Sequence, residues 1–406
     1  MNALGKFHIA KAEDIKRGET TDVYFMRTLK ILKETGLAKV NVTAEITTGR
    51  LPKKWNWGIL CGVEEEIALL EDLPLNVYSL PEGTIFYPKS MNGVREPVMV
   101  IEGPYGVFAH LETAMLGLLC QASGIATAAA KIKIAAKFKP VYSFGIRRMH
   151  PAISPMIDRA VYIGGFDGVS GLMGAKLIGK KPVGTMPHSL IIILGNQIEA
   201  WKKFDEIIEE EVPRIALVDT FYDEKVEAIL AAETLKEKLF AVRLDTPSSR
   251  RGNIKDIVRE VRWELDLRGY KNVKIMVSGG LDEESVRELS EIEVDAFGVG
   301  TSVSNAPTIN FAMDIVEVEG KPRTKRGKMS GKKQIWRCSS CIRDLVLPIG
   351  ENPPKCPLCG RRMKPMLKPI IKNGKRISRE KTATEIREYV LEQLRKMVEL
   401  QEDGSK

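Results

Sequence analysis

Residues 239–245 read LFAVRLD, and residues 273–280 read VKIMVSGG. Each is a short, mostly apolar run that ends in polar or glycine residues, which is the pattern of a buried strand followed by a turn. The residues between them, 253–268, have the periodicity of an amphipathic helix. Two strands joined by such a helix indicate a βαβ unit and a parallel sheet.

The same strand–helix pattern recurs through the middle of the chain. The other strand-like runs are VYSFG (141–145), YIGGFDG (162–168), PVGTM (182–186), RIALVDT (214–220) and DAFGVGT (295–301). Further helical patterns cover residues 196–211, 223–238 and 282–291. We therefore expect an α/β fold with an incomplete or irregular (β/α) barrel as the catalytic domain, over residues 139–310.

The flanking segments have a different character. Residues 1–138 combine short strands, Gly/Pro turns and an apolar helix at about 109–137, which predicts an N-terminal antiparallel α+β domain. Residues 311–378 should form a small basic module with four cysteines. The last part, 379–406, should be an amphipathic helix and a tail.

The positive charge of the chain is concentrated in the basic module. The whole chain carries +9, whereas residues 321–376 hold 17 Lys and Arg against Asp344 and Glu351, or +15. Such a segment can bind nucleic acid, face solvent or contact an acidic neighbouring subunit. Trp336 is its single aromatic residue, so stacking platforms for bases are scarce, and we expect no nucleic-acid partner.

Four of the six cysteines form two CxxC pairs. Cys338 and Cys341 are followed, after 14 residues, by Cys356 and Cys359. This spacing is typical of a closed, structural Zn²⁺ site with four thiolate ligands, rather than of disulfides. The other two, Cys61 and Cys120, have apolar neighbours and should be buried and inert.

The sequence predicts a cytoplasmic protein without a membrane anchor. The first residues, MNALGKFHIAKAEDIKRGE, lack the apolar segment of a signal peptide. Residues 113–130 carry no charge, but they are rich in Ala, Gly, Ser and Thr and include Gln121. A buried interior helix fits this composition better than a bilayer span does.

Polar and glycine residues follow the expected strands, and the carboxyl ends of parallel strands open on one face. Gly279 and Gly280, together with Arg243, suit a phosphate group. Asp219 and Asp245 end adjacent strands and could hold Mg²⁺ with a substrate phosphate. His188 can face Asp219, which would orient it as a nucleophile or base.

With these residues in view, the chain resembles the nicotinate phosphoribosyltransferases, which are type II phosphoribosyltransferases. The zinc module resembles the knuckle-like extension of an archaeal-type branch. The matching strings extend over nearly the whole chain: Thr21-Asp22-Val23-Tyr24, Pro81-Glu82-Gly83-Thr84, Leu111-Glu112-Thr113, Ser143-Phe144-Gly145-Ile146-Arg147-Arg148, Gly184-Thr185-Met186-Pro187-His188-Ser189, Val218-Asp219-Thr220, Val242-Arg243-Leu244-Asp245-Thr246 and Ser278-Gly279-Gly280.

The resemblance implies the joining of nicotinate to phosphoribosyl pyrophosphate, with ATP hydrolysis coupled to it. Phe144 and, from a second subunit, Tyr24 would stack on the pyridine ring, near Arg147 and Thr185. His188 would be phosphorylated by ATP and supported by Asp219 through a hydrogen bond or Mg²⁺, while Asp245 would hold the ribose hydroxyls. The 5′-phosphate would lie against Arg243, Gly279, Gly280, Gly300 and Thr301. The implied assembly is a homo-oligomer built from dimers with shared active sites.

The motifs leave open which pyridine ring is the substrate. Nicotinamide-using relatives place an acidic side chain in the turn that aligns with Ser170, and quinolinate-using relatives surround a dicarboxylate with basic groups. An uncharged Ser170 favours nicotinate, with nicotinamide or quinolinate as the alternatives. A zinc-ribbon RNA-binding barrel is the alternative from a different class of protein.

Overall fold

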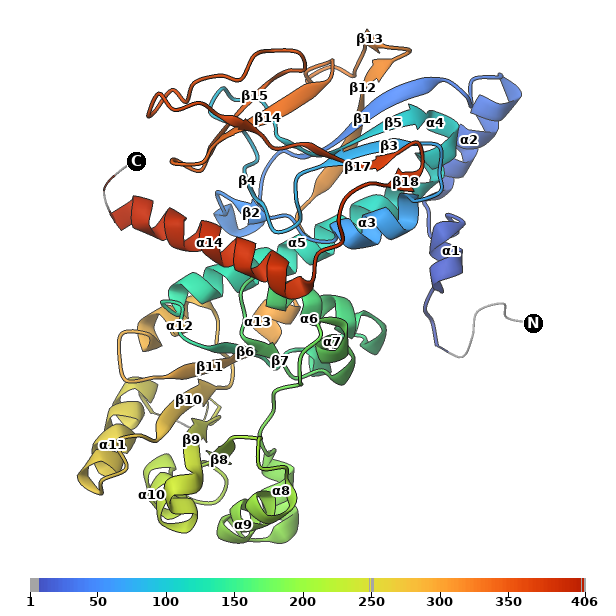
Figure 1. Cartoon of the computed structure of the whole chain (residues 1–406). Helices are drawn as coiled ribbons and strands as arrows, with labels where there is room; N and C mark the ends of the chain where they lie inside the picture. Colours follow the sequence, from blue (N-terminus) through green and yellow to red (C-terminus); the bar gives the residue numbers. More distant parts are fainter. Residues whose placement is uncertain (1–6, 248, 250–251, 403, 405–406) are drawn as a thin grey trace. The chain divides into compact units, whose positions relative to one another are not determined.

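The chain, in this computed structural model, divides into two units (Figure 1). The structure describes residues 7–247, 249, 252–402 and 404. The first unit combines residues up to 127 with those from 307 onward, and the second comprises Ala128–Ala306. The four-part division expected from the sequence, with boundaries at 138, 310 and 378, stays a prediction.

A seven-stranded antiparallel sheet, in the order β13-β12-β1-β5-β3-β17-β18, forms the centre of the first unit. Alternate residues of β1, such as Ala44 and Ile46, are fully buried against a core that includes Phe108 and Leu119 of the helical segment. The strands are β1 (Asn41–Thr48), β3 (Asn76–Ser79), β5 (Pro97–Pro104), β12 (Phe311–Val318), β13 (Lys321–Pro322), β17 (Lys368–Lys372) and β18 (Lys375–Arg376); β2 (Gly58–Ile59) pairs with β4 (Ile85–Phe86).

The helices of this unit are α1 (Ala12–Lys16), α2 (Val23–Glu34), α3 (Val63–Leu70), α4 (Tyr105–Phe108), α5 (Glu112–Ala135), which continues into the second unit, and α14 (Ala383–Glu402), with short 3-10 turns at Pro52–Lys54 and Ala109–Leu111. Gln393 ties α14 to the unit, because its side chain accepts a hydrogen bond from Ile85 N and donates one to Gly83 O. The amphipathic helix predicted within residues 379–406 is confirmed as α14.

Cys338 ends a strand of a small sheet of the first unit, in the order β15-β14-β16, and the other three cysteines lie in the segments between its strands. Its strands are β14 (Lys333–Cys338), β15 (Arg343–Pro348) and β16 (Lys364–Pro365). Basic residues of this part of the chain form ion pairs with acids of the same unit: Lys333 with Glu45, Lys332 with Glu102, Arg337 with Asp344 and Arg376 with Glu64. Asp344 is already counted in the +15, so these pairs balance three of those charges, through Glu45, Glu102 and Glu64.

One helix of the described chain has the length and composition of a membrane span, at Tyr105–Ala135. In its most apolar window 61% is buried inside the protein, as in the core helix of a soluble protein. Its residues Ala126, Ala129 and Ala130 are fully buried. The interior helix predicted for 113–130 is thus confirmed.

The second unit is a curled sheet of six parallel strands in the order β7-β6-β11-β10-β9-β8. This is the predicted incomplete barrel. The strands are β6 (Val141–Ser143), β7 (Gly168–Val169), β8 (Arg214–Leu217), β9 (Leu239–Leu244), β10 (Lys274–Ser278) and β11 (Ala296–Val299). The helices are α6 (Ser154–Ile163), α7 (Leu172–Leu177), α8 (His188–Leu194), α9 (Gln197–Ile207), α10 (Glu224–Leu235), α11 (Ile254–Leu267), α12 (Glu283–Leu289) and α13 (Thr301–Ser304), with 3-10 turns at Ile146–Arg148, Pro151–Ile153 and Lys236–Lys238.

Two of the seven predicted strands are wrong in whole or in part. In YIGGFDG (162–168), the first two residues end α6, and only Gly168 belongs to a strand. Residues 182–186 form no strand; Val183 N donates one hydrogen bond to Val169 O, and Pro182 has no N–H to extend a ladder.

Candidate active site

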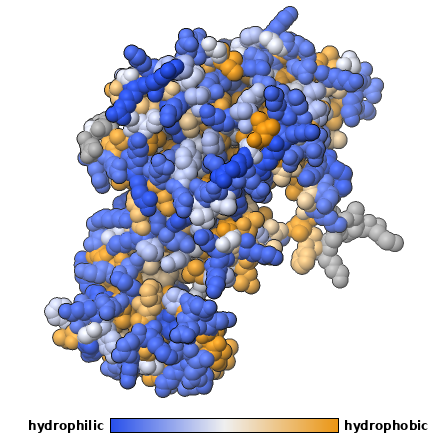
Figure 2. All heavy atoms as spheres, in the orientation of Figure 1, coloured by the Kyte–Doolittle hydropathy of each residue, from blue (hydrophilic) through white to orange (hydrophobic). Residues whose placement is uncertain are grey.

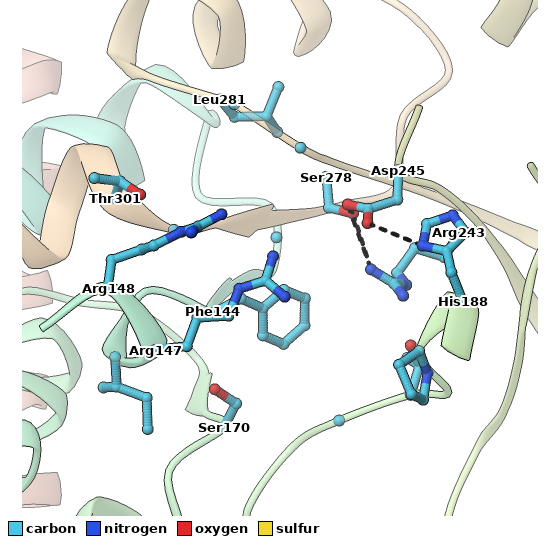
Figure 3. Close-up of a pocket in the computed structure, with 18 of the residues that line it drawn as sticks. Phe144, Arg147, Arg148, Ser170, His188, Arg243, Asp245, Ser278, Leu281 and Thr301 are labelled. Carbon is cyan, nitrogen blue, oxygen red and sulfur yellow. Dashed lines mark hydrogen bonds and ion pairs between the residues drawn. The ribbon is translucent and has the colours of Figure 1, made fainter. Parts of the chain in front are cut away.

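A cavity of about 860 Å³ opens at the carboxyl ends of the strands of the second unit. Figure 3 shows side chains from several strand ends pointing into it. The lining brings together most of the predicted site residues: Phe144, Arg147, Ser170, Thr185, His188, Arg243, Asp245, Gly279, Gly280, Gly300 and Thr301. It also includes Arg148, Met186, Ser278 and Leu281.

His188 and Asp219 form a hydrogen-bonded pair beside this cavity. His188 is the first residue of α8 and follows an irregular segment, and its Nε2 lies 2.9 Å from Asp219 Oδ1. Because the Asp219 side chain is only 2% exposed, its carboxylate works in a partly desolvated setting. The hydrogen bond to Asp219 raises the pKa of His188, against the opposing effect of burial.

The second oxygen of Asp219 is also occupied. Its Oδ2 accepts hydrogen bonds from Asp245 N at 2.7 Å and from the Thr246 hydroxyl at 2.9 Å. These two hydrogen bonds fix the Asp219 carboxylate so that its Oδ1 accepts a hydrogen bond from His188 Nε2. In the neutral histidine the ring proton is therefore assigned to Nε2. The lone pair of that tautomer is then on Nδ1, which lies 4.0 Å from Asp245 Oδ2.

Arg243, on β9, is anchored by two hydrogen bonds and keeps unused donors. Its guanidinium donates to Ser278 Oγ at 3.2 Å and to Met186 O at 3.0 Å, and Ser278 Oγ in turn donates to Asp245 Oδ1 at 2.5 Å. Arg243 Nε is buried and has no hydrogen-bond partner among the described residues. A buried cation with an unused donor at the rim of a cavity suits an anionic ligand.

The glycines near the cavity are required by close backbone approaches. Gly279 and Gly280 have φ of +90° and +71°, and a Cβ on Gly279 would lie 3.0 Å from Asp245 O. A Cβ on Gly298 would lie 2.6 Å from the ring of Phe144. The strand-end glycines therefore leave backbone groups accessible to a ligand, and the missing side chain at Gly298 leaves room for the Phe144 ring.

The wall beside Phe144 carries the residue expected to distinguish substrate rings. Ser170 follows β7 and lines the cavity, and its N–H donates to Ser143 O at 3.1 Å. The nearby acid Asp167 lies at the other end of β6, where it accepts from Lys133 Nζ at 2.7 Å and from Val141 N at 2.8 Å. Asp167 is thus occupied away from the cavity.

Two buried glutamates near the pair were missed in the sequence. Glu224 and Glu227 lie in the first turn of α10, where their side chains contact the segments that follow β8 and β9. The sequence does show a helix start here, with Asp223 before the helix and the acids Glu224 and Glu227 in its first turn.

Comparison with known proteins now identifies the family. Residues 22–123 and 125–314 match the N-terminal and C-terminal domains of quinolinate phosphoribosyl transferase. A solved nicotinate-nucleotide pyrophosphorylase from Pyrococcus furiosus is 61% identical, with a TM-score of 0.93, over 97% of this chain and 99% of that one. A nicotinate phosphoribosyltransferase from Mycobacterium tuberculosis is 29% identical over 83% of this chain and 82% of its own. The chain belongs to the nicotinate phosphoribosyltransferase family.

The human nicotinic acid phosphoribosyltransferase shares the fold at 19% identity, with a TM-score of 0.73 over 93% of this chain and 94% of that one. Another member of the family, from Bacillus subtilis, is 25% identical over 74% of this chain and 66% of its own. The resemblance first drawn from short motifs is therefore confirmed over most of the chain.

Tyr24 belongs to the first unit and so is not among the residues that line the cavity within the second. It lies on α2 and is 55% exposed, although the ring stacks in a tilted arrangement on Phe25. An aromatic side chain this exposed is available for a contact outside its own unit.

The four-cysteine site has the geometry of a metal centre. The sulfur atoms of Cys338, Cys341, Cys356 and Cys359 all lie within 4.8 Å of one another. The 3.5 Å separation of the sulfurs of Cys338 and Cys359 and the 4.0 Å separation for Cys341 and Cys356 approach the ~3.8 Å edge of a tetrahedron with Zn–S bonds of ~2.3 Å. The residues thus fit a structural metal ion such as Zn²⁺.

Proposed function

We propose that this protein transfers the phosphoribosyl group of phosphoribosyl pyrophosphate to nicotinate, giving nicotinate mononucleotide and pyrophosphate in NAD salvage. The observation that carries the proposal is the single cavity on which His188, Arg243, Asp245 and the 279–280 turn converge. The names of the relatives point to the same reaction.

In the proposed reaction the ring nitrogen of nicotinate bonds to C1′ of the ribose as the bond to pyrophosphate breaks. Phe144 would hold the ring flat, with Arg147 and Thr185 near its carboxylate. Arg243 and the backbone of Gly279, Gly280, Gly300 and Thr301 would hold the 5′-phosphate. This arrangement fixes the sugar while positive charge develops at C1′, so that positioning supplies most of the rate enhancement.

Asp245 would orient the sugar. Its Oδ1 is fixed by Ser278, while Oδ2 faces His188, and the carboxylate can accept hydrogen bonds from ribose hydroxyls. Bound Mg²⁺ would neutralise charge on the leaving pyrophosphate. Since both oxygens of Asp219 already accept hydrogen bonds, Asp245 is the better Mg²⁺ ligand of the two.

Coupling to ATP forms the second part of the proposal. The Nδ1 lone pair of His188 would attack the γ-phosphorus of ATP, forming an N–P bond as the bond to the ADP oxygen breaks. Asp219 would stabilise the positive charge on the ring through Nε2. Phosphohistidine hydrolysis would then restore the free imidazole, so that ATP hydrolysis accompanies nucleotide synthesis.

We further propose that the active form is a cytoplasmic homo-oligomer built from dimers, in which Tyr24 of one subunit completes the ring site of another. Helices α7 and α8, on both sides of the 182–187 segment, expose apolar side chains in the single chain, among them Leu172, Met173, Ile192 and Ile193. Figure 2 shows apolar atoms at the surface in the region of α8 and α9. A partner subunit would remove such side chains from water.

Quinolinate is the second candidate substrate, favoured by the match of residues 22–314 to quinolinate phosphoribosyl transferase domains. Arg147 and Arg148 both line the cavity and could receive two carboxylates. The deciding experiment is turnover of nicotinate, nicotinamide and quinolinate with phosphoribosyl pyrophosphate, each with and without ATP. Fastest turnover of nicotinate, stimulated by ATP, is expected; fastest turnover of quinolinate with release of CO₂ would overturn the proposal.

The histidine step needs its own test. His188→Ala should keep slow nucleotide synthesis and lose its stimulation by ATP, because the other ligands of the sugar phosphate remain. Acid-labile phosphate on the wild-type protein, absent from the variant, is expected after incubation with ATP. A variant that retains full stimulation by ATP would refute the phosphohistidine.

A further inference from the structure

The first turn of α10 carries two glutamates whose side chains contact the residues that follow Asp219 and Asp245. Asp223 caps the helix by accepting a hydrogen bond from Val226 N at 2.9 Å. Glu224 and Glu227 follow, three residues apart and so on the same helical face. Glu224 is only 9% exposed and Glu227 is fully buried, so both carboxyl groups depend on partners within the protein.

Glu227 fixes the loop that starts at Asp219. Its carboxylate accepts hydrogen bonds from three consecutive backbone N–H groups, those of Thr220 at 3.0 Å, Phe221 at 2.7 Å and Tyr222 at 2.9 Å. Hydrogen bonds to a charged acceptor are among the stronger ones in proteins. The backbone directly after Asp219 therefore has little freedom.

Glu224 reaches the same carboxylate through Thr246, which follows β9. The Thr246 hydroxyl lies 2.9 Å from Asp219 Oδ2 and 2.5 Å from Glu224 Oε1. Because a hydroxyl carries one proton, Thr246 donates to one of the two carboxyl groups at a time, and its oxygen lies within hydrogen-bond distance of both. In this way the ends of β8 and β9 are joined through side chains as well as through the sheet.

We propose that Glu224 and Glu227 are positioning residues, which hold Asp219 in the orientation that keeps its Oδ1 on His188. Glu227 acts through the loop backbone and Glu224 through Thr246. The expected effect on turnover rests on the proposed function. The expected effect on the His188 ring does not, because the tautomer and titration of that ring can be measured without substrate.

The experiment compares matched variants of the full chain by NMR with labelled histidine. The chain has four histidines, so His188 can be assigned by its loss in His188→Ala. Glu224→Leu and Thr246→Val remove the polar contact at similar volume, whereas Glu224→Gln and Thr246→Ser keep a group able to hydrogen-bond Thr246 or Asp219. The charged groups that act on the His188 ring are Asp219, Asp245 and Arg243, and all stay in place.

Glu224→Leu and Thr246→Val should lower the His188 pKa and weaken its preference for the Nε2–H tautomer, since the hydrogen bond to Asp219 loses its alignment. The ATP-stimulated kcat should fall about tenfold, the factor that corresponds to one hydrogen bond to a charged group, with little change in KM for nicotinate. Glu224→Gln and Thr246→Ser should recover most of both properties.

Unchanged titration and tautomer of His188 in Glu224→Leu and Thr246→Val would overturn the inference. Equal effects of Glu224→Leu and Glu224→Gln would also overturn it, because charge and not hydrogen bonding would then be responsible. Failure of the proposed function looks different: the His188 titration would respond to the variants as described, while the wild type would show no turnover of nicotinate. Glu227→Gln extends the test, provided that its melting temperature shows a folded protein.

Discussion

His188 Nε2 lies 2.9 Å from Asp219 Oδ1, and this contact is the main reason why the pKa of His188 is raised. Asp219→Asn should therefore lower the His188 pKa, because the amide keeps the shape but loses the charge. In the wild type the raised pKa favours the folded state below the ordinary histidine pKa of about 6.5, and this stabilisation is lost as pH rises through the folded-state value. Asp219→Asn should weaken that pH dependence.

An NMR titration of His188 in the two proteins measures the first effect, and thermal unfolding between pH 5 and 8 measures the second. Asp205→Asn is the control, since Asp205 pairs with Arg214 and Lys238 and is not among the groups acting on His188. An Asp219→Asn protein in which His188 titrates as in the wild type would contradict the prediction.

Ser170 lines the cavity without a charge, and the structure keeps the neighbouring acid, Asp167, on Lys133. Ser170→Asp should raise the KM for nicotinate by about tenfold or more, through repulsion between two carboxylates in a partly desolvated cavity. Turnover of nicotinamide should improve relative to nicotinate, because its amide can donate a hydrogen bond to the introduced carboxylate. Competition between the two rings measures the effect, with Ser170→Asn as the uncharged control; an unchanged preference in Ser170→Asp would remove this turn from the ring site.

The ends of most strands could be predicted from the sequence because a parallel sheet is buried on both faces, so its strands are apolar runs with polar ends. LFAVRLD was predicted as a strand at 239–245 and forms β9 over Leu239–Leu244, because a short apolar run that ends in polar residues is typical of a strand buried on both faces. Residues 182–186 (PVGTM) were also predicted as a strand but form none. A short run does not itself show whether a neighbouring strand is available to pair with it in the sheet.

The same limit applies to the site. His188 and Asp219 were paired from their motifs, and the contact is present. Glu224 and Glu227 were missed because a helix start gives the same local pattern whether its acids face solvent or a neighbouring loop. Only the three-dimensional approach of the loops after β8 and β9 separates the two cases.

The four cysteines fit a tetrahedral metal ion, and Cys338 and Cys356 lie in a small cluster with Trp336 and Met363. The purified protein should contain about one zinc per chain, and a strong chelator should lower its melting temperature, since a structural zinc contributes directly to folding. Cys356→Ser should reproduce the loss of metal, whereas Cys61→Ser should retain it. Elemental analysis decides the matter: full metal content in Cys356→Ser would exclude the site.

Arg337 and Asp344 form a buried ion pair within the cysteine-bearing sheet, between β14 and β15. Arg337 donates to both Asp344 oxygens and to Ile85 O, and it is almost wholly buried. Arg337→Met should reduce the free energy of unfolding by about 3–5 kcal/mol, because it leaves a buried carboxylate without its partner. Lys332→Met, which breaks the more exposed pair with Glu102, should cost about 1 kcal/mol or less. Equal losses in urea unfolding would contradict this account.

Asp158, on α6, is fully buried, and the Gly171 backbone N–H and the Ser143 hydroxyl are the polar groups that act on its carboxyl group. A Cβ on Gly171 would lie 2.1 Å from its Oδ2, so the carboxyl group packs tightly under the turn that carries Ser170. Burial raises the pKa of Asp158 to about 6. Between about pH 4 and 6 the unfolded chain therefore releases this proton while the folded protein keeps it, and stability falls as pH rises through that window.

Asp158→Asn removes this ionisation at nearly constant shape. The variant should gain stability relative to the wild type as pH rises from 4 to 6, and the difference should stay constant from there to pH 8, because above pH 6 the wild type must bury a charge that the amide lacks. Taking the difference between the two proteins cancels the titration of every other group. Urea unfolding at pH 4.5, 6 and 8 measures it, and a difference that is flat across the three values would show that Asp158 ionises normally in the folded protein.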